Sequence, residues 1–175
     1  SSISCDDFDG DTVLDIAVSN AYDETVEIFL SPLTTGMPPT DMLTVDGAPQ
    51  SIASGNLNGD TRADLVVACQ SSSSLQFFYQ GDDGLPSSPN PKIGIPSPPS
   101  RVVPGDVSSD GRTDLIVLSE SSCRVHGFLQ GTSTLWSPTP SFGFPSGAVP
   151  RGAVVGDLTG DGVTDIAVAS ARSDW

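Results

Sequence analysis

The chain repeats one short phrase four times, and this repetition limits its possible folds more than any other feature. The copies are "DFDGDTVLDIAVS" at 7–19, "NLNGDTRADLVVA" at 56–68, "DVSSDGRTDLIVL" at 106–118 and "DLTGDGVTDIAVAS" at 157–170. Their first residues are separated by 49, 50 and 51 residues. Self-similarity at a fixed period of this size indicates a repeat architecture in which each unit packs against its neighbours.

The first nine residues of each copy, called here loops 1 to 4, carry oxygen-bearing side chains at positions 1, 3, 5 and 9. Alternate oxygens converging on one point suit Ca²⁺, which takes 6–8 oxygen ligands, backbone carbonyls included. Position 7 varies freely, as expected of a residue that offers only its carbonyl. The spacing therefore predicts up to four calcium ions, one per loop. The predicted ligands are Asp7, Asp9, Asp11, Val13 and Asp15; Asn56, Asn58, Asp60, Arg62 and Asp64; Asp106, Ser108, Asp110, Arg112 and Asp114; and Asp157, Thr159, Asp161, Val163 and Asp165.

Two other interpretations of the loops compete with a calcium site. An EF-hand begins in the same way but needs a bidentate Glu at position 12, where all four copies carry valine. Asp-Gly and Asn-Gly pairs also mark hairpin turns, but a turn does not need four oxygens at fixed spacing. Glycine at position 4 or 6 suits a tight loop with unusual backbone angles. Loops 2 and 3 carry Asn56, Asn58 and Ser108 in place of carboxylates, so weaker binding is expected there.

These phrases resemble the FG-GAP/VCBS repeat family, the calcium-loop blades of integrin-α-type β-propellers. The matching pattern is D-x-D/N-G-D-x-x-x-D-hydrophobic, seen most cleanly in "DFDGDTVLDIAV" and "DLTGDGVTDIAV". The resemblance covers nearly the whole chain and implies four-stranded blades with calcium in the loop between the first two strands. Ser109 departs from it by replacing the position-4 glycine of loop 3, and the family's later "FG…GAP" phrase is not clear.

The predicted fold class is all-β, with β-propeller-type blades of four antiparallel strands, about three to four blades, either open or part of a larger propeller. Only "SSISCD" precedes loop 1, so the first blade is expected to lack its inner strand. The last blade is expected to lack its outer two. Such an array would belong to a longer chain or be completed by neighbouring subunits. The single repeat domain of residues 1–175 is divided into blade 1 (partial) 1–46, blade 2 47–97, blade 3 98–147 and blade 4 (partial) 148–175.

Each period contains further strand signals after the loop. The runs "VEIFL", "LQFFYQG" and "VHGFLQG" fall at one offset from the position-9 aspartate and predict the third strand. His126 aligns with Glu27 and Gln76, so it is expected to be an exposed strand residue. Outer strands are expected near 41–45, 92–95 and 140–144, among prolines that edge strands tolerate.

The predicted calcium loops explain much of the excess of acidic residues. The formal net charge is −15, and twelve of the 22 acidic residues stand at predicted ligand positions. Four calcium ions would reduce the charge to about −7. The acidity argues against nucleic-acid binding. No apolar run reaches membrane-spanning length and no signal peptide is visible, so membrane insertion is not expected.

Loops of low calcium affinity suit the millimolar calcium outside cells, so an extracellular or cell-surface location is expected. One disulfide is then expected, and Cys69–Cys123 is the favoured pair, with Cys5 left over; buried free thiols are the alternative. The Ser-, Thr- and Pro-rich linkers either carry O-glycans or protect the outer edges from pairing. No N-x-S/T sequon occurs, so N-glycosylation is not expected.

Two functions from different classes are consistent with these features. The first is an extracellular calcium-binding β-propeller repeat segment that acts as an adhesion, glycan-binding or assembly scaffold. Its partners would be protein or glycan ligands, or copies of itself in a surface assembly. The alternative is the propeller part of a polysaccharide-acting enzyme, a lyase or hydrolase. The chain has one histidine, no G-x-S-x-G and no recognisable nucleophile–base spacing, so no catalytic residue is predicted.

Overall fold

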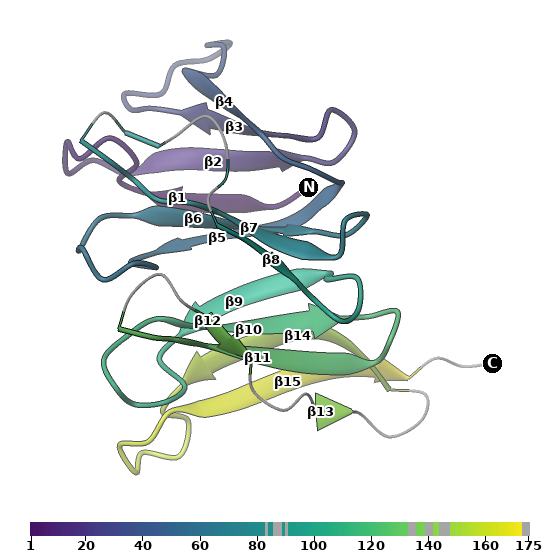
Figure 1. Cartoon of the computed structure of the whole chain (residues 1–175). Coiled ribbons are helices and arrows are strands. Elements are labelled where there is room, and N and C mark those ends of the chain that lie inside the picture. Colours follow the sequence, from purple (N-terminus) through teal and green to yellow (C-terminus); the bar gives the residue numbers. More distant parts are fainter. Residues whose placement is uncertain are drawn as a thin grey trace.

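The structure is a computed structural model that describes residues 1–82, 84–85, 89, 91–132, 136–138, 142–143 and 148–172. Within these residues the chain forms strands β1 to β15 and no helix. The strands make four antiparallel sheets that follow one another along the chain and stack as blades (Figure 1). The predicted all-β, blade-like fold class is therefore confirmed.

Blade 1 contains four strands, and the expectation that it lacks its inner strand is wrong. The short polar segment before loop 1 pairs with the second strand from Ile3↔Val18 to Asp6↔Asp15. The segment has four residues and Ile3 is 65% exposed, so it lacks the buried apolar run by which the other strands could be recognised. The strands, in sheet order, are β1 (Ile3–Asp6), β2 (Asp15–Asn20), β3 (Thr25–Phe29) and β4 (Asp41–Thr44).

Blades 2 and 3 have the same strand order. Blade 2 consists of β5 (Pro49–Gly55), β6 (Asp64–Cys69), β7 (Ser74–Phe78) and β8 (Lys92–Gly94). Blade 3 consists of β9 (Arg101–Gly105), β10 (Asp114–Ser119) and β11 (Arg124–Gln130), with an outer strand in two pieces, β12 (Trp136–Pro138) and β13 (Phe142–Gly143). Both pieces pair with β11, at opposite ends of it. Much of the outer strand expected at 140–144 lies outside the described residues.

The fourth sheet contains two strands in the described part of the chain, β14 (Ala148–Gly156) and β15 (Asp165–Arg172). Its strands are long, and they pair along their whole length with one bulge between Pro150 and Gly152. Val154 and Ile166 are 57% and 40% exposed. The apolar sequence of this hairpin is therefore only partly covered by blade 3.

Second strands are buried on both faces, as their continuous apolar runs predict. In β6, Leu65 and Val67 pack toward blade 1, whereas Val66 and Ala68 pack toward blade 3. All six residues of β6 and of β10 are buried. Each interface between blades thus has its own apolar cluster, and neighbouring blades share the burial that stabilises each of them.

The inner strands lie close together where blades 3 and 4 meet. A Cβ atom built on Gly105 would lie 2.5 Å from Cγ1 of Val155. A side chain there would push the two blades apart, so glycine at the end of β9 is a requirement of packing.

Two expectations about single residues are wrong. His126 is 4% exposed rather than exposed, because blade packing covers both faces of β11; its Nε2 lies 3.0 Å from Ser97 Oγ. The Cys69–Cys123 disulfide is not formed, and all three cysteines are free thiols. Cys69 is buried in the core between blades 1 and 2, and burial raises the pKa of its thiol to about 12.

A search of the described residues for a helix long and apolar enough to cross a membrane found none.

Candidate metal loops

The four loops lie along the same side of the array, at the left in Figure 1. Each loop joins the inner strand of a blade to its second strand, and the blades repeat this connection in the same orientation. The turns between second and third strands lie along the opposite side. One side of the molecule therefore carries all twenty predicted ligand residues.

The loop backbones share an unusual conformation. Positions 4 and 6 have positive φ in all four loops, between 58° and 90°. Glycine tolerates this at low cost, but Thr12, Thr61 and Ser109 adopt it with side chains, which is strained. The predicted need for unusual backbone angles is thus confirmed, and loop 3 keeps the conformation despite its serine at position 4.

The position-1 side chain organises each loop by accepting backbone N–H groups. In loop 1, Oδ1 of Asp7 accepts from Gly10 (2.6 Å) and Asp11 (3.1 Å), and Oδ2 accepts from Thr12 (2.8 Å). Asp157 makes the equivalent contacts in loop 4, where the N–H groups of Gly162 and then Gly160 lower the pKa of its carboxyl. These carboxylates are held ionised and in place by the loop itself.

Loop 1 brings three of its predicted ligands together. One carboxylate oxygen from each of Asp7, Asp9 and Asp15 lies within 4.8 Å of the others. Partial desolvation raises the pKa of Asp9, and the carboxylates of Asp11, Asp15 and Asp7 act in the same direction. Such a cluster of like charges suits a divalent cation that would neutralise them. Within the described residues, it is the one group in which three acidic side chains place an oxygen this close to one another.

The position-9 aspartates of loops 1, 2 and 3 have a structural role that the sequence did not reveal. All three are fully buried. Each accepts hydrogen bonds both from its own loop and from a residue at or just after the C-terminal end of the third strand. In loop 2, Oδ2 of Asp64 accepts the N–H of Leu57 (2.8 Å) and Oδ1 accepts the N–H of Gln80 (2.9 Å). Burial raises the pKa of Asp64 to about 6, with the Asp60 carboxylate adding to the shift. The matching bonds run from Phe8 and Ser31 to Asp15, and from Val107, Ser108 and Gln130 to Asp114.

Asp165 of loop 4 differs from these three. Its Oδ2 accepts the N–H groups of Leu158 (2.9 Å) and Thr159 (3.0 Å), but no donor in the described residues reaches Oδ1. It is also partly exposed. The difference follows from the fold, because the described part of blade 4 has no third strand to supply the donor.

Sequence reasoning missed two supporting positions. The residue at position 2 inserts an apolar side chain beside the loop, and Phe8 and Leu57 are 2% and 0% exposed. The glutamine sixteen residues after the position-9 aspartate accepts the position-8 N–H through its side chain, at 3.1 Å in both Gln80–Ala63 and Gln130–Thr113. The signal was present, because "FFYQG" and "GFLQG" place glutamine at the same offset.

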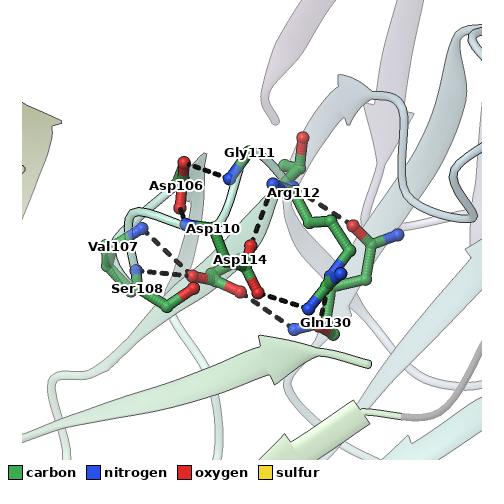
Figure 2. A network of polar contacts seen from close by, with 9 residues as sticks. Asp106, Val107, Ser108, Asp110, Gly111, Arg112, Asp114 and Gln130 are labelled. Carbon is green, nitrogen blue, oxygen red and sulfur yellow. Dashed lines mark hydrogen bonds and ion pairs between the residues drawn. The ribbon is translucent and has the colours of Figure 1, made fainter. Parts of the chain in front are cut away.

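The position-7 arginines of loops 2 and 3 use their side chains, not only their carbonyls. In loop 3, Arg112 forms an ion pair with Asp110, and its Nε donates to the carbonyl oxygen of Gln130 (3.1 Å), as Figure 2 shows. In loop 2, Arg62 pairs with Asp82, and Asn58 Nδ2 donates to Asp60 Oδ2 (3.0 Å). Nitrogen donors therefore contact the position-5 carboxylate of both middle loops.

Sheets of four antiparallel strands, stacked in sequence order, define a segment of the β-propeller type. A model of the FG-GAP-like repeat matches residues 56–117 and 106–168, which together span well over half of the chain. The chain therefore belongs to the FG-GAP-like repeat family. Each match begins at position 1 of a loop and ends in the second strand of the following blade.

Among solved structures, the chain is similar to BBS1N, crystallised in complex with ARL6DN and soaked with lead. The TM-score is 0.62 at 19% identity, over 98% of this chain and 45% of that chain. A likeness at this identity concerns the fold alone, and the chain spans under half the length of that neighbour. No curated protein matches the sequence.

Proposed function

We propose that this chain is a calcium-stabilised, non-enzymatic propeller scaffold that binds a protein partner outside the cell. The observation that carries the proposal is the convergence of Asp7, Asp9 and Asp15 in loop 1, on the side of the molecule where all four loops lie. Carboxylate and carbonyl oxygens are the ligands that calcium prefers. In this proposal, bound calcium neutralises the loop carboxylates and keeps the loops rigid.

The charge of the molecule supports a calcium role and an extracellular location. A net charge of −15 on 175 residues is self-repelling, and most of it is concentrated in the loops. Extracellular calcium modules bind with dissociation constants near 10⁻⁴–10⁻³ M, which the millimolar calcium outside cells would satisfy. Loops with neutral ligands, such as Thr159 of loop 4, fit that affinity range.

A protein-binding role rests on the kind of fold. Propeller blades present broad faces, and the family that matches is a repeat family rather than a catalytic one. The neighbour BBS1N was crystallised with a protein, ARL6DN, which favours a protein partner over a small substrate for this chain. The buried position-9 carboxylates are committed to backbone N–H groups, which leaves them unsuited to acid–base catalysis.

Thermal unfolding with and without calcium tests the proposal. With a dissociation constant of roughly 0.1–1 mM, each site occupied at millimolar calcium adds about 0.4–1.4 kcal/mol. For a chain of this size, about 1 kcal/mol corresponds to about 2–4 °C in Tm. We expect Tm to fall by several degrees in chelator and to recover with calcium but less with magnesium. An unchanged Tm would refute the calcium role.

A second measurement addresses the partner. The calcium-loaded chain, immobilised, is probed with extracellular proteins and, in parallel, with a glycan array. We expect a saturable protein interaction that weakens in chelator and no glycan signal. Calcium-dependent glycan binding would replace the protein-scaffold proposal with a lectin, and turnover of a polyuronic substrate would replace it with an enzyme.

A further inference from the structure

The four loops fall into two classes according to the residue at position 7. Loops 1 and 4 carry Val13 and Val163 there, with side chains 49% and 55% exposed, whereas loops 2 and 3 carry Arg62 and Arg112. The two classes also differ in their position along the stack. The arginine loops belong to blades 2 and 3 in the middle, and the valine loops belong to blades 1 and 4 at the two ends (Figure 1).

In loop 3 the arginine occupies the electrostatic role of a metal ion. Its guanidinium forms an ion pair with Asp110, the position-5 ligand, and its Nε is tied to the Gln130 carbonyl on the end of β11. Figure 2 shows the side chain lying across the loop between these groups. Gln130 is further held by Asp114, which accepts its N–H at 2.9 Å. The positive charge is therefore fixed by two groups, the carboxylate of a predicted ligand and a backbone carbonyl that Asp114, another predicted ligand, helps to hold in place.

In loop 2 the position-5 carboxylate is also met by a nitrogen donor of the loop. Asn58, at position 3, donates through Nδ2 to Oδ2 of Asp60 (3.0 Å), while its Oδ1 accepts the backbone N–H of Asp60 (2.8 Å). Arg62 extends past the loop to Asp82, with Nη1 lying 3.5 Å from the Gln80 carbonyl oxygen. Arg62 and Arg112 thus each approach the backbone carbonyl of the glutamine that follows the position-9 aspartate by sixteen residues, Gln80 in blade 2 and Gln130 in blade 3.

The charge of each loop follows the same division. Loops 1 and 4 carry four and three carboxylates and no basic residue, whereas loops 2 and 3 carry two and three carboxylates together with one arginine. A calcium ion entering loop 2 or 3 would meet a fixed positive charge close to its ligands, and like charges at this range repel. In loop 3 it would also compete with Arg112 for the carboxylate of Asp110.

We propose that Arg62 and Arg112 are built-in cations that take the place of calcium in loops 2 and 3, so that the chain binds two calcium ions, at loops 1 and 4. This inference rests on the proposed calcium role. In this arrangement, the loops of blades 2 and 3 are held without metal, whereas the loops of blades 1 and 4 depend on calcium. Position 7, which contributes only a carbonyl as a ligand, is then the residue that selects between metal and arginine.

The experiment counts ions per chain by calcium titration with equilibrium dialysis, on the whole chain and on single variants whose folding is checked by circular dichroism. The wild type is expected to bind two ions. Val13→Arg transfers the arginine to loop 1 at an exposed position and is expected to reduce the count to one. Asp11→Ala, which removes a loop 1 ligand, should have the same effect.

Two further variants test the arginine directly. Ser108→Asp combined with Arg112→Val gives loop 3 the ligand set of loop 1 and is expected to raise the count to three. Ser108→Asp alone keeps the arginine and should leave the count at two. Arg151→Val, which removes an arginine paired with Glu120 outside the loops, controls for the change of net charge and should also leave it at two.

The outcomes separate the inference from the proposal on which it rests. A wild type that binds three or four ions keeps the calcium role but overturns the arginine inference. A count of two for the Val13→Arg variant, or for the Ser108→Asp/Arg112→Val variant, overturns it as well. A wild type that binds no calcium overturns the calcium role itself.

Discussion

At the scale of single residues, the position-9 aspartate combines two tasks, because it is a predicted ligand and also a buried brace. Asp114 accepts N–H groups from the loop and from the end of β11 and is fully buried. Asp165 stands at the same repeat position but is partly exposed, and donors from the described residues reach only one of its oxygens. Asp114 and Asp165 are therefore expected to contribute differently to stability, although they occupy the same position of the motif.

This difference is tested by replacing each aspartate with asparagine in calcium-free buffer. In Asp114→Asn, the amide NH₂ would face a backbone N–H that has lost its acceptor, and an unsatisfied buried donor costs about 1–3 kcal/mol. Asp165→Asn can turn its NH₂ to the side that lacks a donor, so its cost is expected to be below about 0.5 kcal/mol. Urea unfolding measures both. Equal losses would show that burial of the aspartate does not set its contribution.

At the scale of elements, the apolar residue at position 2 links loops 1 and 2 to the core between blades. Leu57 is fully buried in the cluster shared by blades 2 and 3, whereas Leu158 at the same position of loop 4 is 57% exposed. A large-to-small change in a packed core loses transfer free energy and leaves a cavity. The same change at an exposed side chain loses little.

We therefore expect Leu57→Ala to lower the free energy of unfolding by about 2–5 kcal/mol. Leu158→Ala, the matched control in an equivalent loop, is expected to change it by less than about 0.5 kcal/mol. Both are measured by urea unfolding in saturating calcium. If Leu158→Ala were as costly as Leu57→Ala, blade 4 would be covered in solution by something beyond the described structure.

At the scale of the whole molecule, stability is expected to vary along the stack of blades. Local opening is hardest where strands are buried on both faces and paired on both edges, as β6 and β10 are. The one strand paired with β15 in the described structure is β14, and the apolar side chains of Val154 and Ile166 are exposed. Within the described residues, blade 4 is thus the blade with the fewest paired strands.

Hydrogen exchange followed by mass spectrometry measures this gradient. Peptides covering 64–69 and 114–119 are expected to exchange at rates set by global unfolding, whereas a peptide covering 165–172 should exchange much faster, because half of the strand's N–H groups point away from β14. Uniform slow exchange in all three would contradict the gradient and would indicate that β15 is paired with another strand in solution.

Much of the architecture could be predicted from the sequence, because its signals are local and repeated. The spacing of the loops and the apolar runs after them indicated antiparallel blades, and the aligned third-strand runs located β3, β7 and β11. The failures were β1, His126 and the Cys69–Cys123 disulfide. The segment 3–6 is short and its apolar residue Ile3 is exposed, so it carries no buried apolar run like those of the second strands. The burial of His126 depends on a neighbouring element, which no pattern along one strand can report.

The sequence by itself determined the positions of the loops, their oxygen-bearing residues and the order of the strands, since these depend on spacing and on side-chain chemistry along the chain. Only the tertiary structure decided how those residues are used. It showed Asp64 and Asp114 bound to backbone N–H groups, Arg112 paired with Asp110, and Asp165 with one oxygen that no donor of the described residues reaches. These differences arise because hydrogen bonds and burial depend on which strands meet in space, and four nearly identical phrases meet different neighbours.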